Sequence, residues 1–287
     1  MTTKNYLSIY AKSFNWSGFF LPRKIYFKCS VLYDFCRTID NIADQNKDLE
    51  IKKKELEEFK KKFEQKNKND NVIKNMWDLM NEFNISKKIV DDLFDGVESD
   101  LKKEVRIKTE KELLVYSYRV AGTVGLMMAK ILNIKKKESL QRAIDLGIAM
   151  QLTNIARDVV EDEKKDRIYL IKNSQDIFSN IKETISKADS FYNSSFPGIK
   201  DIPLSCRFSI IVARRVYRQI GKKILKKKDI ESYRKAGKIY VPNFEKILQT
   251  IFSLIDLIVL FFIKPRKHDK ENEYNLISED IGLNERI

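Results

Sequence analysis

Histidine, cysteine and glycine are scarce in this chain. Its 287 residues contain one histidine, His268, in a polar C-terminal stretch. A Ser-His-Asp triad, a Cys-His dyad and a metal site of several histidines are therefore excluded. The three cysteines, Cys29, Cys36 and Cys206, form no C-x-x-C pair, so zinc binding and thioredoxin-type chemistry find no support. An odd and sparse cysteine count is typical of a reducing compartment.

The nine glycines form neither G-x-G-x-x-G nor a Walker loop. Without such a loop, a bound phosphate must be held by metal ions or by arginine, lysine and tyrosine side chains. Residues 1–10 show no basic region followed by an apolar run, so no secretory signal is predicted. Together with the cysteine usage, this indicates a cytoplasmic protein.

Proline is absent between Pro22 and Pro197, which favours long helices because nothing in this stretch breaks them. Apolar residues recur at intervals of three and four, and no alternating strand pattern is present. The sequence predicts helices at about 109–133 (opened by a capping box of Thr109 and Glu112), 137–163 and 203–225. We expect a single all-α domain of about ten helices over residues 1–246.

The chain is basic, with 55 Lys and Arg against 41 Asp and Glu and a net charge of +14. The lysines are interleaved with acids, as at 52–62, and lack the interleaved aromatic side chains that stack on bases. No nucleic-acid partner is predicted. The charge reflects either a lysine-rich composition or a preference for anionic partners, namely diphosphates or a membrane surface.

Residues 247–263 are nearly all apolar, and the polar interruptions Gln249, Ser253 and Asp256 fall along one stripe. The run is short for a spanning helix, and a central carboxylate is costly in a bilayer. It is either a last core helix or a helix lying in a membrane interface, with the cytoplasmic protein then peripheral to the inner face of the membrane. The polar tail 264–287 is expected to be frayed, and 65–71 to be a surface loop.

Residues 33–44, Y-D-F-C-R-T-I-D-N-I-A-D, form the first informative segment. In a helix, Tyr33, Arg37, Asp40 and Asp44 share an arc of roughly 40° on an otherwise apolar surface. The two aspartates repel each other at this spacing. Either Arg37 relieves that repulsion in a structural ion pair, or a magnesium ion bound to substrate phosphates does.

A second segment, residues 151–162, repeats the pattern in Q-L-T-N-I-A-R-D-V-V-E-D. Gln151, Asn154, Asp158 and Asp162 share an arc of roughly 80° beside an apolar side. Two acidic stripes in one chain suggest that they face each other across a cavity. A cluster of magnesium ions bridging to diphosphate would satisfy all four carboxylates, with Asn154 as a neutral oxygen ligand.

Between these segments lies Y-S-Y-R-V-A-G-T-V-G-L-M-M, residues 116–128. Gly122 and Gly125 each cost about 1 kcal/mol relative to alanine in a helix. They let another helix approach the backbone closely, or they line a long apolar slot beside the acidic cavity.

The chain resembles the squalene and phytoene synthase family, and bacterial phytoene synthases most. The resemblance rests on the two acidic motifs, on residues 119–128, on K-S-F at 12–14 and on A-R-R-V-Y-R-Q-I-G at 213–221, and covers residues 10–240. It implies an isoprenoid-synthase fold with a central cavity between aspartate-bearing helices. Tyr10 and Ala11 stand where the family usually has histidine and serine.

The resemblance also implies roles for individual residues. Mg²⁺, with Mn²⁺ as the alternative, would be bound by Asp40, Asp44, Asn154, Asp158 and Asp162. The diphosphates would contact Lys12, Ser13, Tyr33, Arg37, Gln151 and Arg157. Tyr116 would lie near the reacting carbons, and Tyr233 would contact substrate.

The implied activity is condensation of two geranylgeranyl diphosphates to phytoene through a cyclopropyl diphosphate, without NADPH. Dehydrosqualene or squalene synthesis from farnesyl diphosphate is the alternative, because the depth of an apolar slot cannot be read from the sequence. A non-catalytic, membrane-associated assembly protein of the same fold is a third reading. Such a protein would be expected to lose the aspartates, all of which are present here.

Overall fold

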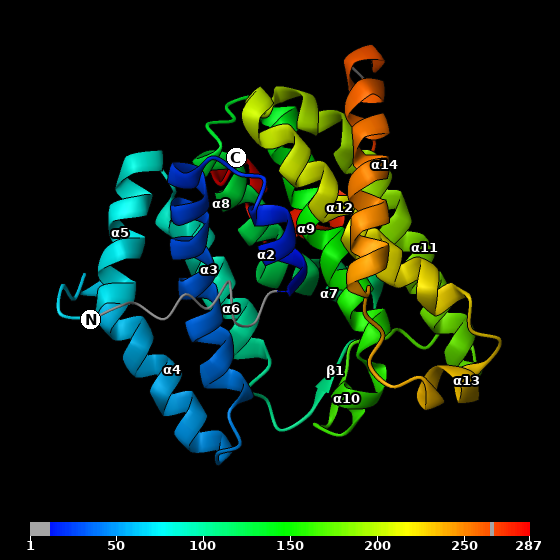
Figure 1. The fold of residues 1–287 in the computed structure, drawn as a ribbon. Helices are drawn as coiled ribbons and strands as arrows, with labels where there is room; N and C mark the ends of the chain where they lie inside the picture. Colours follow the sequence, from blue (N-terminus) through cyan, green and yellow to red (C-terminus); the bar gives the residue numbers. More distant parts are fainter. Residues whose placement is uncertain (1–11, 265–266) are drawn as a thin grey trace.

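The computed structural model describes residues 12–264 and 267–287, apart from the side chains of residues 12–14. The described chain is almost entirely helical (Figure 1), which confirms the all-α prediction. The longer elements are α2 (Lys12–Gly18), α3 (Arg23–Asp44), α4 (Leu49–Glu64), α5 (Asn71–Phe83), α6 (Lys87–Ser99), α7 (Glu110–Ser117), α8 (Thr123–Ile131), α9 (Lys137–Arg157), α11 (Ile177–Ser195), α12 (Leu204–Leu225), α14 (Asn243–Phe262) and α15 (Glu271–Ser278).

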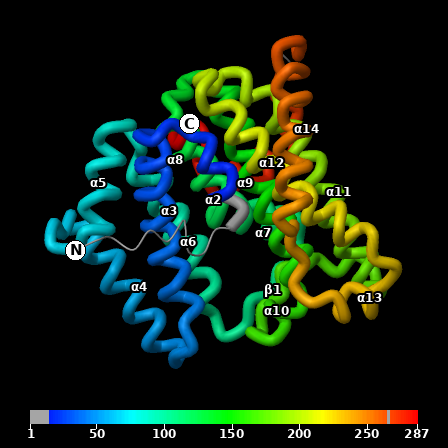
Figure 2. Tube along the Cα trace, in the orientation of Figure 1, coloured from blue at the N-terminus to red at the C-terminus, as the bar shows by residue number. Residues whose placement is uncertain are grey.

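Helix α9 occupies the middle of the molecule and packs against α8, α11 and α12. Its side chains Ile144, Ile148 and Leu152 are fully buried. On the other side of the core, α3 packs against α5 and α8. The C-terminal end of α3 and the short helix α10 (Val159–Glu163) lie at the same end of the molecule (Figure 2), so the two acidic segments are brought to one region.

The predicted 109–133 helix begins with the expected capping box, in which Thr109 and Glu112 satisfy each other's backbone N–H groups. It is not uniform, however. A π-helical turn, η1 (Tyr118–Gly122), separates α7 from α8. Such single π turns occur where a helix is reshaped around a functional site.

The predicted 137–163 helix is interrupted at Asp158, where the backbone angles are φ −104° and ψ 15°. Residues 137–157 form α9, and α10 follows after the interruption. Asp158 N–H still donates to Asn154 O, and Asp162 N–H to Asp158 O, so the break is a kink rather than a turn. The expected continuous stripe of Asn154, Asp158 and Asp162 is therefore bent at its middle member.

One short pair of strands interrupts the helices, although the sequence shows no alternating strand pattern. β1 (Val105–Arg106) and β2 (Arg167–Ile168) pair in parallel. Two residues per strand are too few to show an alternating sequence pattern. The pair joins the segment after α6 to the segment after α10, beside the acidic residues.

The glycines of residues 116–128 serve helix packing. A Cβ at Gly125 would lie 2.2 Å from the carbonyl oxygen of Ala143, and one at Gly147 would lie 2.2 Å from that of Ala121. The backbones of α8 and α9 therefore approach closely through these two positions. The structure favours helix packing over an apolar slot as the reason for Gly125.

Residues 267–287 of the C-terminal tail fold onto the rest of the molecule, contrary to the expectation that the tail is frayed. Helix α15 contacts α7, and Tyr274, Ile277 and Ile281 are buried. His268 is also buried, with its Nε2 atom 2.8 Å from Asp145 Oδ2. This segment folds because Tyr274, Ile277 and Ile281 recur at intervals of three and four and lie on one side, where they are buried. The mean composition of the segment is polar, so composition alone did not predict this packing.

Residues 247–262 lie within α14 and Ile263 follows it, and in the described chain no helix combines the length and hydrophobicity needed to cross a bilayer. Most of the apolar side chains of α14 are exposed, which favours the interfacial interpretation over a last core helix. Residues 65–70 form an exposed turn between α4 and α5, as predicted.

Candidate functional site

The predicted polar stripe of α3 faces away from the core. Leu32, Phe35 and Ile39 are fully buried on one side of the helix, whereas the side chains of Asp40 and Asp44 on the other are 52% and 41% exposed. The apolar periodicity of the sequence dictates this division. Tyr33 and Arg37 lie on the same stripe and are partly buried. Arg37 Nη1 is 3.9 Å from Asp40 Oδ2.

Two cations from the segment after α10 hold Asp44. Arg167 Nη1 lies 3.1 Å and Lys165 Nζ 3.2 Å from Asp44 Oδ1. Both cations lower the pKa of Asp44, although loss of hydration raises it. The end of α3 thus contacts the chain that follows the second acidic segment, and the facing of the two acidic stripes stays a prediction.

Asp158 is also paired with cations. Its carboxylate accepts hydrogen bonds from the neighbouring Arg157, with 2.8 Å to Nε, and lies 3.2 Å from Lys238 Nζ. Burial opposes ionisation, but these contacts hold the pKa of Asp158 below its ordinary value. Arg157, predicted to contact diphosphate, therefore points its guanidinium toward the acidic region.

Asn154 has an unsatisfied oxygen. Its amide nitrogen donates to Gln151 Oε1 at 3.4 Å, but its buried Oδ1 atom accepts no hydrogen bond from any described residue. A buried amide oxygen without a partner is unfavourable unless something else binds it. This is what a neutral oxygen ligand of a metal ion would show before the ion binds.

Asp100, just after α6, was missed by sequence reasoning. Its carboxylate accepts a 2.6 Å hydrogen bond from the Tyr169 hydroxyl and one of 3.1 Å from the Tyr116 hydroxyl. The two tyrosine rings are stacked, with centroids 4.7 Å apart. Tyr116 is thus held at the edge of the acidic region, and Asp100 and Tyr169 fix its position.

The carboxylates of this region act on one another. Loss of hydration raises the pKa of Asp40 to about 6, with Asp44 and Asp100 adding to the rise and Arg37 opposing it. The pKa of Asp162 rises to about 7 for the same first reason, with Asp158 and Asp100 adding to the rise. Asp100 itself is raised to about 6. The charge of Asp100 therefore raises the pKa of an aspartate in each acidic segment, so Asp100 is close enough to interact with both segments.

These residues do not form a ready-made metal cluster. Among the described residues, no group of three or more His, Cys, Asp or Glu side chains is close enough to hold a metal ion. Asp44 and Asp158 are instead satisfied by Lys and Arg. The acids of both segments lie in one region. To bind a divalent ion, Asp44 and Asp158 would have to release their lysine and arginine partners.

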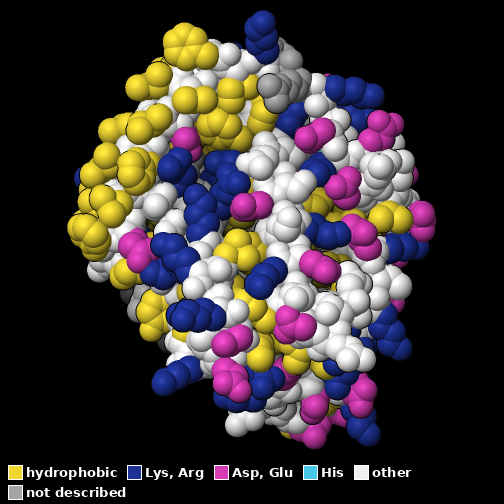
Figure 3. Space-filling view, turned by 90° about the vertical axis from the view of Figure 1, so that its right-hand side faces the viewer, with side chains coloured by type: hydrophobic (Ala, Val, Ile, Leu, Met, Phe, Trp, Pro, Cys, Tyr) yellow, Lys and Arg dark blue, Asp and Glu magenta, His cyan; other side chains and the backbone are white. Residues whose placement is uncertain are grey.

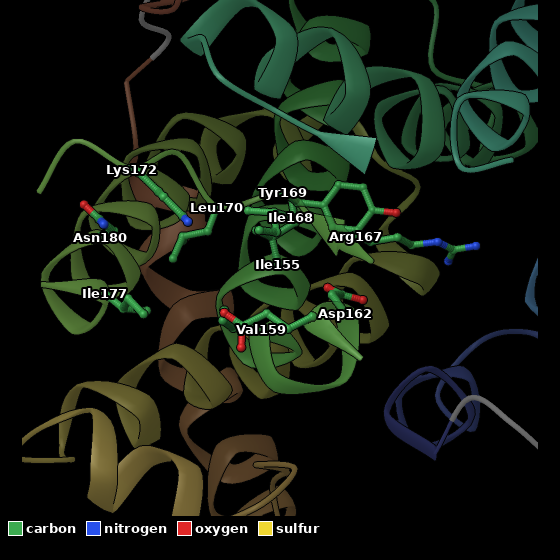
Figure 4. A pocket seen from close by; sticks show the side chains of 11 residues that line it. Ile155, Val159, Asp162, Arg167, Ile168, Tyr169, Leu170, Lys172, Ile177 and Asn180 are labelled. Carbon is green, nitrogen blue, oxygen red and sulfur yellow. The ribbon is translucent and has the colours of Figure 1, made fainter. Parts of the chain in front are cut away.

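The cation Arg167 and the ring of Tyr169 are brought in by β2. Figure 4 shows the guanidinium of Arg167 and the hydroxyl of Tyr169 directed to the same side, away from the apolar side chains of Leu170 and Ile177. The cavity behind them has a volume of only about 20 Å³, too small for a prenyl chain. Sequence reasoning missed Arg167 and Tyr169. They follow the second acidic segment closely, but no motif marks them.

Three predicted substrate contacts fall elsewhere or cannot be placed. Tyr233, in α13 (Ile230–Lys235), is buried and its hydroxyl donates to the carbonyl oxygens of Ala156 and Arg157. Its visible role is to support the end of α9, and substrate contact stays a prediction. The side chains of Lys12 and Ser13 lie outside the described part of the chain, as does the whole of residues 10–11.

Residues 8–172 match the family model described as squalene/phytoene synthase. The chain belongs to the squalene/phytoene synthase family. A 15-cis-phytoene synthase of Paracoccus sp. (strain N81106 / MBIC 01143) is 38% identical over 157 residues, which are 50% of this chain and 51% of that protein. A phytoene synthase of Pseudescherichia vulneris is 37% identical over 157 residues, 49% and 50% of the two chains. The chain thus spans about half the length of these relatives.

Solved structures of family proteins share the fold. A dehydrosqualene synthase in complex with ligand superposes with a TM-score of 0.75 and 26% identity, covering 88% of this chain and 94% of that one. A squalene synthase from Alicyclobacillus acidocaldarius has a TM-score of 0.62 and 18% identity, covering 82% and 92%. The isoprenoid-synthase fold expected from the sequence is confirmed.

Proposed function

We propose that this family member is a prenyltransferase that condenses two geranylgeranyl diphosphates head to head into phytoene, through a cyclopropyl diphosphate and with release of diphosphate. The observation that carries the proposal is the Asp44–Arg167 contact, which joins the first acidic segment to β2, the strand that follows the second. The matched relatives are named phytoene synthases, which supports the choice of product.

The residues of this region fit divalent cations. Carboxylate and amide oxygens are the ligands that Mg²⁺ prefers, with substrate phosphates completing its coordination. Asp40, Asp44, Asn154, Asp158 and Asp162 would hold Mg²⁺, or Mn²⁺ in its place. The buried Asn154 Oδ1 atom, which accepts no hydrogen bond from a described residue, fits a neutral oxygen ligand of such an ion. When bound, such ions neutralise the leaving diphosphate.

The chain's own cations would share this task. Arg157, Lys165 and Arg167 already pair with the acids and can turn to a diphosphate when a divalent ion takes their place. Arginine binds phosphate oxygens through two parallel N–H donors, which orients the group as well as neutralising it. Arg37, at the edge of α3, would contact the same group from the opposite side.

The stacked rings of Tyr116 and Tyr169 would border the reacting carbons. Their hydroxyls are bound to Asp100 and their rings are stacked on each other, so the pair would meet a substrate through ring atoms rather than through a free hydroxyl. An aromatic face stabilises a nearby cation through its negative quadrupole. Rings fixed in this way would also exclude water from an allylic cation, which water would quench.

Dehydrosqualene synthesis from farnesyl diphosphate is the second candidate. It is favoured by the superposition on a dehydrosqualene synthase over 88% of this chain. NADPH is not expected for either product, whereas squalene would require it. For either C30 or C40 product we also propose that the enzyme works at the inner surface of the cytoplasmic membrane, because both products are water-insoluble hydrocarbons.

The experiment is incubation of purified protein with farnesyl or geranylgeranyl diphosphate, with Mg²⁺ and with or without NADPH, read by mass spectrometry. Phytoene from the C20 substrate, independent of NADPH, is expected. A C30 product alone would establish the second candidate instead. If no diphosphate is consumed although magnesium-dependent substrate binding is seen in calorimetry, the catalytic proposal is wrong.

Variants test the residues themselves. Asp44→Ala and Asp158→Ala are each expected to lower the rate by about 100-fold or more, since each removes a charged ligand. Asp78→Ala is the matched control, because Asp78 is exposed on α5 and pairs only with Lys74 among the described residues. Full activity in either site variant would contradict the proposed metal site.

A further inference from the structure

Helix α14 has its polar side turned toward the protein. Its Thr250 hydroxyl accepts a 3.0 Å hydrogen bond from the indole of Trp16. Its Asp256 carboxylate accepts one of 2.6 Å from Arg215, and Arg215 also donates to Gln249 at 3.3 Å. The polar side of α14 is therefore turned toward α2 and α12, and its residues Gln249, Thr250 and Asp256 are partly buried there.

The outer side of α14 is apolar along its whole length. Its most exposed side chain, Phe262, is 81% accessible, and Ile258 is 59% accessible. The apolar face comprises Phe244, Ile247, Ile251, Phe252, Leu254, Ile255, Ile258, Val259, Phe261 and Phe262. Figure 3 shows hydrophobic side chains gathered along one upper edge of the molecule, over α14, bordered by Lys and Arg. A helix that is polar inward and apolar outward is unfavourable in water, and a contiguous patch of this kind marks an interaction site.

We propose that the apolar face of α14, together with lysines at its two ends, docks the protein on an anionic phospholipid bilayer. The 20-residue helix would lie in the plane of the leaflet, with its apolar face among the acyl chains and its lysines at the phosphates. This surface deepens the proposed function, because it names where a hydrocarbon product would be delivered.

A lysine-lined cleft lies at the N-terminal end of α14. It has a volume of about 610 Å³ and lies between α12, α13 and the start of α14. Its cations are Lys223, Lys226, Lys227 and Lys238, against one acid, Glu245, which pairs with Lys223. Among the described residues, Lys226 and Lys227 pair with no carboxylate, so they are available to a phosphate headgroup.

The rim of this cleft suits a membrane interface. Tyr240 and Phe244, beside the lysines, are 70% and 69% exposed. Aromatic side chains are enriched at the level of lipid headgroups, where their rings contact both apolar and polar groups. The cleft therefore combines anion-binding side chains with interfacial aromatic ones.

Basic side chains also flank the other end of the helix. Lys264 and Lys267 are exposed after α14. Lys200, from the 3-10 helix η2 (Phe196–Asp201), donates to the carbonyl oxygens of Phe261 and Ile263 and so satisfies the end of the helix. With lysines at both ends, attraction to anionic lipids would align the whole helix with the surface.

A bilayer fits this surface better than a second copy of the chain. Helix α14 stands out from the body and extends beyond its neighbours (Figure 1), so its face is a convex ridge rather than a flat patch. A two-fold dimer through this ridge would also bring the lysines of each copy toward those of the other. Anionic lipids are deformable and carry the complementary charge.

The test is flotation of the full chain with vesicles of phosphatidylcholine alone, or with about 30% phosphatidylglycerol. Wild type is expected to float with the anionic vesicles. Ile251→Glu with Ile258→Glu should weaken this binding by about ten-fold or more, because both carboxylates would enter the apolar layer. Lys226→Glu with Lys227→Glu should weaken binding to the anionic vesicles by about ten-fold, and leave binding to phosphatidylcholine unchanged.

Lys61→Glu with Lys62→Glu, on α4, is the matched control, because it makes the same change in net charge on an element that does not pack against α14. It should bind like wild type. Equal weakening by this control, or binding unaffected by the α14 variant, would overturn the proposal. The proposal would also be overturned if wild type forms an oligomer that the α14 substitutions dissociate, and if neither wild type nor the α14 variant binds vesicles.

Two further measurements distinguish loss of membrane binding from loss of folding and from loss of catalysis. Thermal melting of each variant shows whether it folds, and the cleft variant serves if the α14 variant does not. Turnover of soluble substrate should be unchanged in the cleft variant. Vesicle binding without any prenyltransferase activity would remove the proposed function and leave the docking surface standing.

Discussion

Arg167 Nη1 lies 3.1 Å from Asp44 Oδ1, so a residue that follows the second acidic segment neutralises the last aspartate of the first. The same guanidinium lies 3.4 Å from the carbonyl oxygens of Ala43 and Asp100. Arg167 thereby connects three segments that are far apart in the sequence. Its charge occupies the place where the proposed function requires a divalent ion or a diphosphate.

We predict that Arg167→Gln binds Mg²⁺ more tightly but turns over more slowly. Without the guanidinium, the ion no longer competes for Asp44, so the half-saturating Mg²⁺ concentration in calorimetry should fall several-fold. The KM for diphosphate substrate should rise because a phosphate contact is lost. Lys103→Gln, an exposed lysine before β1, should change neither value. Weaker Mg²⁺ binding in Arg167→Gln would contradict the competition.

Asp162 should make the metal-free protein sensitive to pH. Its pKa of about 7 in the folded chain exceeds the value of about 3.9 of an unfolded aspartate. The folded state therefore binds the proton more tightly, and the stabilisation by protonation is present below about pH 4 and lost as the pH rises through 7. With a chelator present, Asp162→Asn is expected to be more stable than wild type at pH 8, by on the order of 1 kcal/mol after solvent screening.

Calorimetric melting at pH 4 and pH 8 measures this difference. The gain should vanish at pH 4, where Asp162 is neutral in wild type. Added Mg²⁺ should raise the melting temperature of wild type more than that of the variant. Glu57→Gln, exposed on α4, is the control for removal of one charge. A variant that melts below wild type at pH 8 would show that Asp162 is stabilised by its surroundings.

Asp100→Asn should loosen both stacked tyrosines. Asp100 accepts from Tyr169 and Tyr116, and an amide has only one acceptor oxygen for the two hydroxyls. We expect the free energy of unfolding to fall by about 1–2 kcal/mol in urea denaturation. Turnover should fall as well, since Tyr116 loses its position. In a double-mutant cycle with Tyr169→Phe, additive losses would mean that the two residues act independently.

His268→Ala should release the C-terminal segment. Asp145, which is fully buried, accepts hydrogen bonds from the Ser194 hydroxyl at 2.7 Å and from the Tyr274 hydroxyl at 3.0 Å, besides its contact with His268. Loss of one partner of a buried carboxylate should lower the free energy of unfolding by about 1–3 kcal/mol. Faster hydrogen exchange in α15 would confirm release, and His268→Gln should retain part of the contact. Unchanged exchange would show that the apolar contacts of α15 suffice.

The sequence by itself determined where most of the helices lie and how α3 is divided into a buried and a polar side. Both follow from local rules, since the spacing of apolar residues and the absence of proline act within one or two turns. The four aspartates and Asn154 were found in the same way. Each acidic segment is a pattern within about twelve consecutive residues, so no long-range contact is needed to recognise it, although the second one is divided between α9 and α10. The family was recognised from the resemblance of short motifs.

Only the tertiary structure decided what those acids meet. Asp100 follows α6 whereas Arg167 and Tyr169 lie in and just after β2, and their meeting depends on β1, β2 and the kink at Asp158. The same holds for α14, whose composition is compatible with either a core helix or an interfacial one. Its orientation is fixed by Trp16 and Arg215, which draw its polar side inward. These contacts join residues that are tens to hundreds of positions apart in the sequence, so local periodicity cannot predict them.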